Sequence, residues 1–176
     1  LLDYFQSILF HIFNINWFSY ILHSALVNSL LALVCFYLFK NIGLNNFFSV
    51  SYSLSISVLA YPSAGTPFMD HHAVIFSLIS ISYLILALLK DKKKFWFLSS
   101  LFIVFSFFSK QIPSAYIAFL TTLIILAYLF IIKKKNNNFF YFFGGGLIGI
   151  IFFFLLFINN RIPIQNFLTQ YIYYPL

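Results

Sequence analysis

The sequence has 176 residues, of which 62% are hydrophobic, 23% are aromatic and only 7% are charged. A soluble domain carries roughly 45–50% apolar and about 25% charged residues. This composition therefore excludes an ordinary soluble domain, and it also excludes a disordered chain, which would be poor in aromatic and aliphatic residues. The length allows about six membrane helices of ~20 residues each. We expect an all-α, polytopic transmembrane helical bundle that forms a single membrane domain over residues 1–176.

Ten Lys and Arg residues against three Asp residues give a formal net charge of +7. The basic residues lie between hydrophobic runs rather than along one face, so we expect membrane lipids as partners and no nucleic acid. Cys35 is the only cysteine, which excludes an intramolecular disulfide and a cysteine metal cluster. The chain begins with Leu and shows no signal peptide, and we expect it to be a fragment of a longer protein.

The first sixteen residues predict an interfacial amphipathic helix. Asp3, Ser7, His11 and Asn14 are spaced by four, four and three positions, so they share one helical face. Apolar and aromatic residues fill the other face. Such a helix lies on the membrane surface before the first span.

Six hydrophobic runs follow, and we interpret each as a transmembrane helix. Residues 159–176 would then form a segment on the outer side. The second run alternates serine with apolar residues, a strand-like period, but we interpret it as a helix whose serines allow close packing. The runs cover residues 17–39, 46–61, 72–89, 95–109, 112–132 and 139–158.

The lysines assign the two sides of the membrane. Lys40 and the clusters at 90–94 and 133–135 hold eight of the ten basic residues, and with six spans they all fall on one face, which should be cytoplasmic. This requires a turn at residues 110–113 rather than one long helix over 95–132. We expect an integral protein of the cytoplasmic (inner) membrane, if the source is bacterial, with its active site on the non-cytoplasmic side.

Asp70, His71 and His72 stand at the outer start of the third run. An acid beside histidines suits general acid–base catalysis, so Asp70 and His71 are candidate catalytic residues and His72 a candidate for substrate binding. No cofactor is required. Adjacent histidines point about 100° apart on a helix, so no metal is assigned, although His71 and His72 could hold a divalent ion with further ligands. The alternative is a helix start that Asp70 caps.

Lys110 and Arg161 are the candidate binding residues for a donor phosphate on the outer side. Lys110 precedes a helix start near Pro113, where free backbone N–H groups favour an anion. The alternative for both is a cation that reaches the lipid headgroups. Asp3 and His11 also fall on this side and are further candidates for substrate binding. A lone histidine in an apolar helix, such as His23, is expected to be a packing residue.

Three stretches carry a resemblance to a known class. They are the opening LLDYFQSILFHIF, the span that starts at Asp70, and FSFFSKQ at residues 105–111 with its lysine at a turn. Together they resemble the GT-C class of membrane glycosyltransferases, of the protein-mannosyl and lipid A aminoarabinosyl transferase type. The opening looks like that family's juxtamembrane helix.

The resemblance implies sugar transfer from a polyprenyl-phosphate-linked donor to a lipid, glycan or protein acceptor at the outer face of the membrane. The acceptor is unknown, and the principal catalytic acid of such enzymes stands in an outer loop, expected here upstream of Leu1. The alternative is a polytopic transporter or flippase that moves an amphiphilic substrate without catalysis. Transporters tend to place such residues near the bilayer midplane, whereas here the ionisable residues gather at one face.

Overall fold

The computed structural model describes residues 2–132, 137–169 and 173. These residues form eight α-helices and no strand, which confirms the predicted all-α class. The helices are α1 (Leu2–Phe13), α2 (Trp17–Asn41), α3 (Asn46–Leu59), α4 (Met69–Lys90), α5 (Lys93–Ser109), α6 (Gln111–Ile132), α7 (Asn138–Asn159) and α8 (Ile164–Leu168).

Three helices, α2, α4 and α7, are long and apolar enough to cross a membrane. Two shorter apolar helices, α3 and the segment Ser114–Tyr128 of α6, lie between them, and α5 has 17 residues. The molecule is thus a helical bundle with the composition of a membrane protein. The count of six spans stays a prediction.

The chain breaks between α5 and α6, where the sequence predicts a turn. Ser109 ends α5, Lys110 has an extended backbone, and Ile112 departs from helical geometry with φ −103° and ψ 125°. The two helices therefore form a hairpin. After α7 the chain turns at Arg161 and forms the short α8, which the sequence analysis did not predict.

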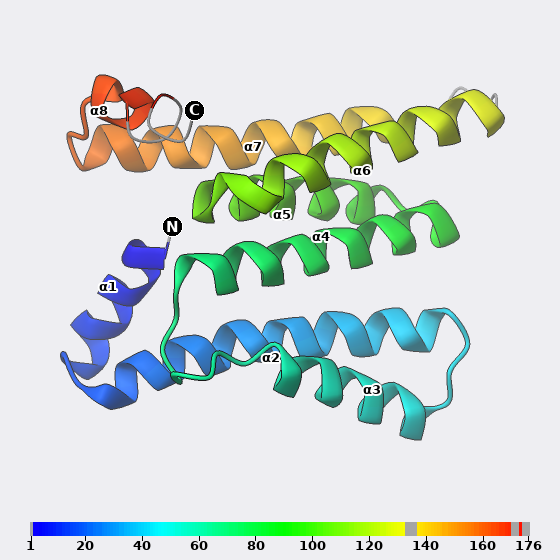
Figure 1. Ribbon diagram of the computed structural model, residues 1–176. Coiled ribbons are helices and arrows are strands. Elements are labelled where there is room, and N and C mark those ends of the chain that lie inside the picture. Colours follow the sequence, from blue (N-terminus) through cyan, green and yellow to red (C-terminus); the bar gives the residue numbers. More distant parts are fainter. Residues whose placement is uncertain (1, 133–136, 170–172, 174–176) are drawn as a thin grey trace.

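Successive helices run back and forth, so that α2, α4 and α6 point one way and α3, α5 and α7 the other (Figure 1). Lys40 and the lysines around Asp91 consequently lie at one end of the bundle. Asp70 and Lys110 lie at the opposite end, with α1 and α8. The cluster at 133–135 lies outside the described residues.

The predicted N-terminal helix forms, but it packs on the bundle more closely than an interfacial helix requires. Asp3, Ser7 and His11 are exposed on α1, as the pattern of the sequence indicates. Gln6 and Leu9 are buried against the neighbouring helices. The burial of Gln6 brings a polar side chain into the bundle.

Small residues hold α4, α5, α6 and α7 together. Ser106 hydrogen-bonds the hydroxyls of Ser77 at 2.7 Å and Ser114 at 2.5 Å, and Ser80 donates to the carbonyl of Ser99 at 2.7 Å. Lipid tails are as apolar as leucine, so packing of small residues and interhelical hydrogen bonds, rather than the hydrophobic effect, hold helices together in a bilayer. The close contact of α7 with α5 depends on Gly145 and Gly149 in the same way.

Gly145→Ala is expected to destabilise the protein by about 1–3 kcal/mol, the usual effect of overpacking. A Cβ at Gly145 would overlap the backbone carbonyl of Phe97, and the backbone cannot move aside cheaply. Gly144→Ala is the matched control because nothing lies near its Cβ, and alanine favours a helix by up to about 1 kcal/mol. Thermal unfolding in lipid nanodiscs measures both variants. Equal melting temperatures would contradict the close packing of α5 and α7.

Candidate functional site

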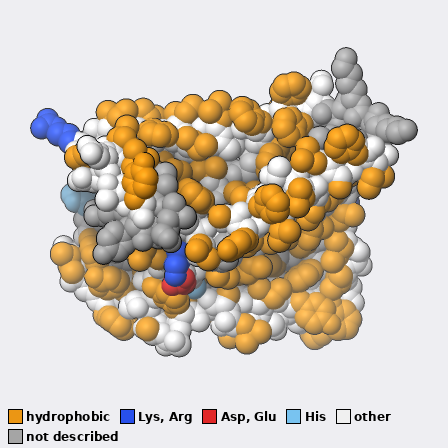
Figure 2. All heavy atoms as spheres, turned by 45° about the horizontal axis from the view of Figure 1, so that its top comes forward, with side chains coloured by type: hydrophobic (Ala, Val, Ile, Leu, Met, Phe, Trp, Pro, Cys, Tyr) orange, Lys and Arg blue, Asp and Glu red, His pale blue; other side chains and the backbone are white. Residues whose placement is uncertain are grey.

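Asp70 and Lys110, forty positions apart, form an ion pair at the end of the bundle opposite the lysines of residues 90–94. The N-cap of α4 is Phe68 and makes no side-chain hydrogen bond, so the alternative in which Asp70 caps this helix is wrong. Its carboxylate instead accepts from the Lys110 ammonium. Figure 2 shows a basic side chain against an acidic one on a surface that is mostly hydrophobic.

The ion pair is accessible and contributes little to stability. The Lys110 and Asp70 side chains are 42% and 54% exposed, and exposed pairs of this kind contribute about 0–1 kcal/mol. An incoming anion could therefore replace the Asp70 carboxylate as the partner of the Lys110 ammonium at a small cost in free energy. The site therefore combines the Lys110 ammonium, which can bind a phosphate, with the Asp70 carboxylate, which can accept from a hydroxyl.

The adjacent His71 and His72 bind different partners on α2. Nε2 of His71 lies 2.8 Å from Oδ1 of Asn28, whereas Nε2 of His72 lies 2.9 Å from Nε2 of His23. The two rings therefore do not converge on one point. In the described part of the chain, no group of three or more metal-ligating side chains could hold a metal ion.

His72 belongs to a buried hydrogen-bonded chain that crosses three helices. Nδ1 of His72 lies 3.2 Å from the carbonyl of Phe68, and Nδ1 of His23 lies 2.7 Å from Oε1 of Gln6. If the Phe68 carbonyl and Oε1 of Gln6 both accept, each Nδ1 must carry a proton, and a third proton must lie between the two Nε2 atoms. The rings of His23 and His72 would then carry a positive charge together. If the Gln6 amide is rotated so that its own Nε2 donates to Nδ1 of His23, two protons on the two rings suffice and the hydrogen-bonded chain is neutral. The neutral form is favoured because an unpaired buried charge is costly.

Asn28 determines which nitrogen of His71 carries its proton. The Asn28 amide Nδ2 donates to the Ser57 carbonyl at 2.6 Å, so Oδ1 is the atom that faces His71. Nε2 of a neutral His71 must then donate, and Nδ1 must be the bare acceptor. Nδ1 is buried without a hydrogen-bond partner.

The other candidates from the sequence do not join this site. Asp3 and His11 are exposed on α1, and Arg161 is exposed in the turn after α7. In residues 2–132, 137–169 and 173, no hydrogen bond or ion pair links them to Asp70 or Lys110. Among the predicted site residues, the structure pairs Asp70 with Lys110 and places Asp70 and His71 in the lining of one hollow, whereas the His72 ring is buried against His23.

His23, which was expected to be a packing residue, is fully buried and hydrogen-bonded on both ring nitrogens. Three further polar residues of the site were missed from the sequence. Gln6, Asn28 and Ser57 were not singled out. The available signal was the presence of His23 and Asn28 inside an apolar helix, because polar side chains at membrane depth are costly and mark functional positions.

Comparison of the chain with protein-family models, with curated proteins and with solved structures finds no match.

Proposed function

We propose that the chain is the membrane core of a glycosyltransferase that moves a sugar from a polyprenyl-phosphate-linked donor to an acceptor at the outer face of the membrane. One observation carries this proposal. An accessible lysine, an accessible carboxylate and a buried set of imidazoles come from separate segments of the chain to one end of an apolar bundle.

An apolar hollow beside these residues suits the hydrocarbon part of such a donor. It has a volume of about 270 Å³, lies between α1, α2, α4 and α5, and has His72 as the one polar residue of its lining. Phe105 in its wall precedes Lys110 by five residues, or about 7.5 Å along a helix. A chain in the hollow could thus place its phosphate at Lys110.

The chemistry assigns a role to each charge of the ion pair. In the transfer, the bond between the sugar and the phosphate oxygen breaks, and a bond from the sugar to an acceptor oxygen forms. Lys110 stabilises the negative charge that remains on the polyprenyl phosphate. Asp70, released from Lys110, takes the proton of the acceptor hydroxyl, and His71 lies beside it. No metal is needed for these steps.

The intact protein, reconstituted with polyprenyl-phosphate mannose or glucose in a membrane lipid extract, is expected to release polyprenyl phosphate as the sugar is transferred. Asp70→Asn should abolish this release because the amide cannot accept the proton, while membrane insertion and abundance stay normal. Asp91→Asn, a change at the other end of the bundle, is the control. Undiminished release by Asp70→Asn would contradict the assignment.

The same proposal includes six spans, formed by α2 to α7, with the lysine-rich end in the cytoplasm. The hairpin break at Lys110 and the lysines at the opposite end support it. In a Cys35→Ala background, Ser63→Cys should be labelled from the outside by a membrane-impermeant maleimide. Asn137→Cys should be labelled only from the cytoplasmic side. Labelling of both from one side would contradict this topology.

A transporter or flippase of an amphiphile is the second candidate, and the buried chain of Gln6, His23 and His72 favours it. Protonatable groups inside spans mark proton relays in many transporters. A transporter would move a fluorescent polyprenyl-phosphate sugar across the bilayer without cleaving it. Reconstituted vesicles distinguish the two functions by measuring the sidedness and the intactness of the same donor.

A further inference from the structure

Residues of α2, α4 and α5 line a hollow at the lysine-rich end of the bundle. It has a volume of about 280 Å³, and α4 packs against both α2 and α5. Leu33 is 66% exposed and Tyr37 is 42% exposed in the lining, so the hollow opens on the outer surface of the bundle. In a protein that spans a membrane, lipid covers this surface.

The hollow extends along α2. Leu30, Leu33, Val34 and Tyr37 all line it, and their spacing of i, i+3, i+4 and i+7 places them in one stripe of the helix. Leu30 and Tyr37 are about 10 Å apart along the helix axis, which is roughly a third of the ~30 Å hydrocarbon core of a bilayer. The stripe therefore follows the direction of an acyl chain that lies parallel to the helices.

A lysine stands in the lining at the end nearest the helix termini. Lys94 is exposed in the first turn of α5, and its Nζ lies 5.0 Å from the centroid of the Phe95 ring. The Phe95 ring contacts those of Tyr37 and Tyr83, with centroid distances of 5.9 and 6.2 Å. These three rings belong to the same lining. The Lys94 ammonium thus lies against the aromatic wall of the hollow.

The charges around this end favour an anion. Residues 90–94 contain four lysines and Asp91, all of them exposed, and the Asp91 carboxylate accepts from the amide of Asn138. Basic clusters of this size at the end of a membrane helix are typical of sites for anionic lipids. Lys93 lies over the ring of Tyr141 on α7 instead, so Lys94 is the lysine that lines the hollow.

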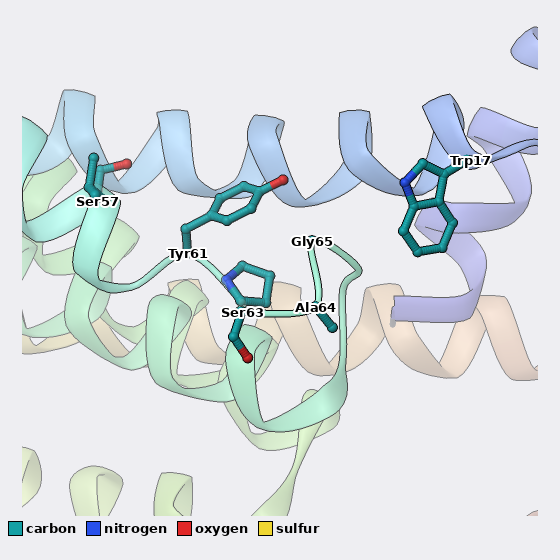
Figure 3. Close-up of a pocket in the computed structure, with 8 residues that line it drawn as sticks. Trp17, Ser57, Tyr61, Ser63, Ala64 and Gly65 are labelled. Atoms are coloured by element: carbon teal, nitrogen blue, oxygen red, sulfur yellow. The ribbon is translucent and has the colours of Figure 1, made fainter.

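Two other hollows lack this combination. The one of about 500 Å³ between Trp17 and the loop after α3 has neutral polar side chains, among them Tyr61 and Ser63 (Figure 3). The apolar hollow proposed for the donor shares Leu30 with the present one, and its described lining contains no lysine or arginine. An apolar stripe that ends at a lysine therefore distinguishes the hollow at Lys94.

We propose that the hollow at Lys94 binds an anionic glycerophospholipid from the leaflet at the lysine-rich end. One acyl chain lies along Leu30 and Leu33, and the lipid phosphate pairs with the Lys94 ammonium. Phosphatidylglycerol fits this site better than phosphatidylcholine, whose choline ammonium would face the surrounding lysines. The inference does not depend on the proposed function, because it concerns the end of the bundle opposite Asp70 and Lys110.

Native mass spectrometry of the intact protein, titrated in detergent with phosphatidylglycerol or phosphatidylcholine of the same acyl chains, measures the affinity of the first bound lipid. Phosphatidylglycerol is expected to bind about fivefold more tightly, the effect of roughly one lysine near a membrane surface. Lys94→Gln should remove this preference. Lys93→Gln is the matched control, because it loses the same charge over Tyr141, away from the hollow, and it should keep the preference.

Leu33→Trp tests the position of the acyl chain. Because Leu33 is exposed, the larger side chain can be accommodated without disturbing the core, and the indole should occupy the hollow. The affinity of the first lipid should fall by about tenfold, the equivalent of roughly two methylene groups that are no longer buried. Ile21→Trp, at an exposed position near the other end of α2, is the control and should leave the affinity unchanged.

Equal losses of phosphatidylglycerol affinity in Lys94→Gln and Lys93→Gln would indicate a diffuse attraction to the lysine-rich end and would overturn the inference. Undiminished affinity in Leu33→Trp would overturn it too. Glycerol 3-phosphate, which has the phosphate without the chains, should not displace the lipid at equimolar concentration. Displacement by it would indicate a site for a free phosphate, and displacement by a polyprenyl phosphate would indicate that the donor chain fills this hollow. Either result contradicts the inference.

Discussion

Lys110→Ala is expected to weaken binding of a polyprenyl-phosphate sugar by about ten- to a hundredfold, since a charge-assisted hydrogen bond contributes roughly 1.5–3 kcal/mol. Lys110 follows Ser109, the last residue of α5, and directly precedes the start of α6, and its side chain is 42% exposed. Lys110→Arg should retain part of the affinity because it keeps the charge. Titration of the purified intact protein with the donor measures the effect.

Lys93→Ala is the matched control, because Lys93 lies at the lysine-rich end, over the ring of Tyr141. The ion pair between Asp70 and Lys110 leads to a further prediction about donor binding. Asp70→Asn removes the competitor for the ammonium, so this variant should bind the donor at least as tightly as wild type while it loses turnover. If Lys110→Ala binds as tightly as Lys93→Ala does, Lys110 is a snorkelling anchor and the phosphate site lies elsewhere.

His72→Leu is expected to destabilise the protein by about 1–3 kcal/mol, the usual cost of leaving a buried polar group without its partner. The change leaves Nε2 of His23 unsatisfied in a fully buried position. The double variant His23→Leu/His72→Leu removes both partners and should lose less stability than the two single changes added together. Unfolding in bicelles measures the free energy of each variant.

The control for this double-mutant cycle combines His72→Leu with Ser24→Ala. Ser24 is also buried, and its hydroxyl makes no hydrogen bond, so its effect should add to that of His72→Leu. If the losses in unfolding free energy of His23→Leu and His72→Leu were strictly additive, the two rings would not share a proton. The hydrogen-bonded series from Gln6 to Phe68 would then stabilise the protein by packing alone.

Much of the architecture was predictable because membrane helices follow simple rules. Apolar runs predict helices, and lysines between them predict which ends lie together. The break at Lys110 followed from both rules, since one long helix would have put lysine clusters on opposite sides. The end of the bundle that holds Asp70 and Lys110 was predicted in this way.

The contacts within the site were not predictable, because they depend on how helices rotate and pack. The sequence gives Asp70 and Lys110 separate roles, and nothing in it indicates that they pair across forty positions. His23 has its partners on two other helices, so its own surroundings in the sequence look like those of a packing residue. The bare Nδ1 of His71 follows only from the amide orientation of Asn28, which its contact with Ser57 determines.

The central claim is that the phosphate of a lipid-linked sugar binds at Lys110. Solid-state NMR of the intact protein, labelled with ¹⁵N-lysine and bound to the donor, measures the dipolar coupling between the donor phosphorus and lysine Nζ. We predict a coupling in wild type and in Lys93→Arg, and its loss in Lys110→Arg, where the labelled nitrogen is absent. A coupling that persists in Lys110→Arg, or no coupling in wild type with the donor bound, would contradict the account.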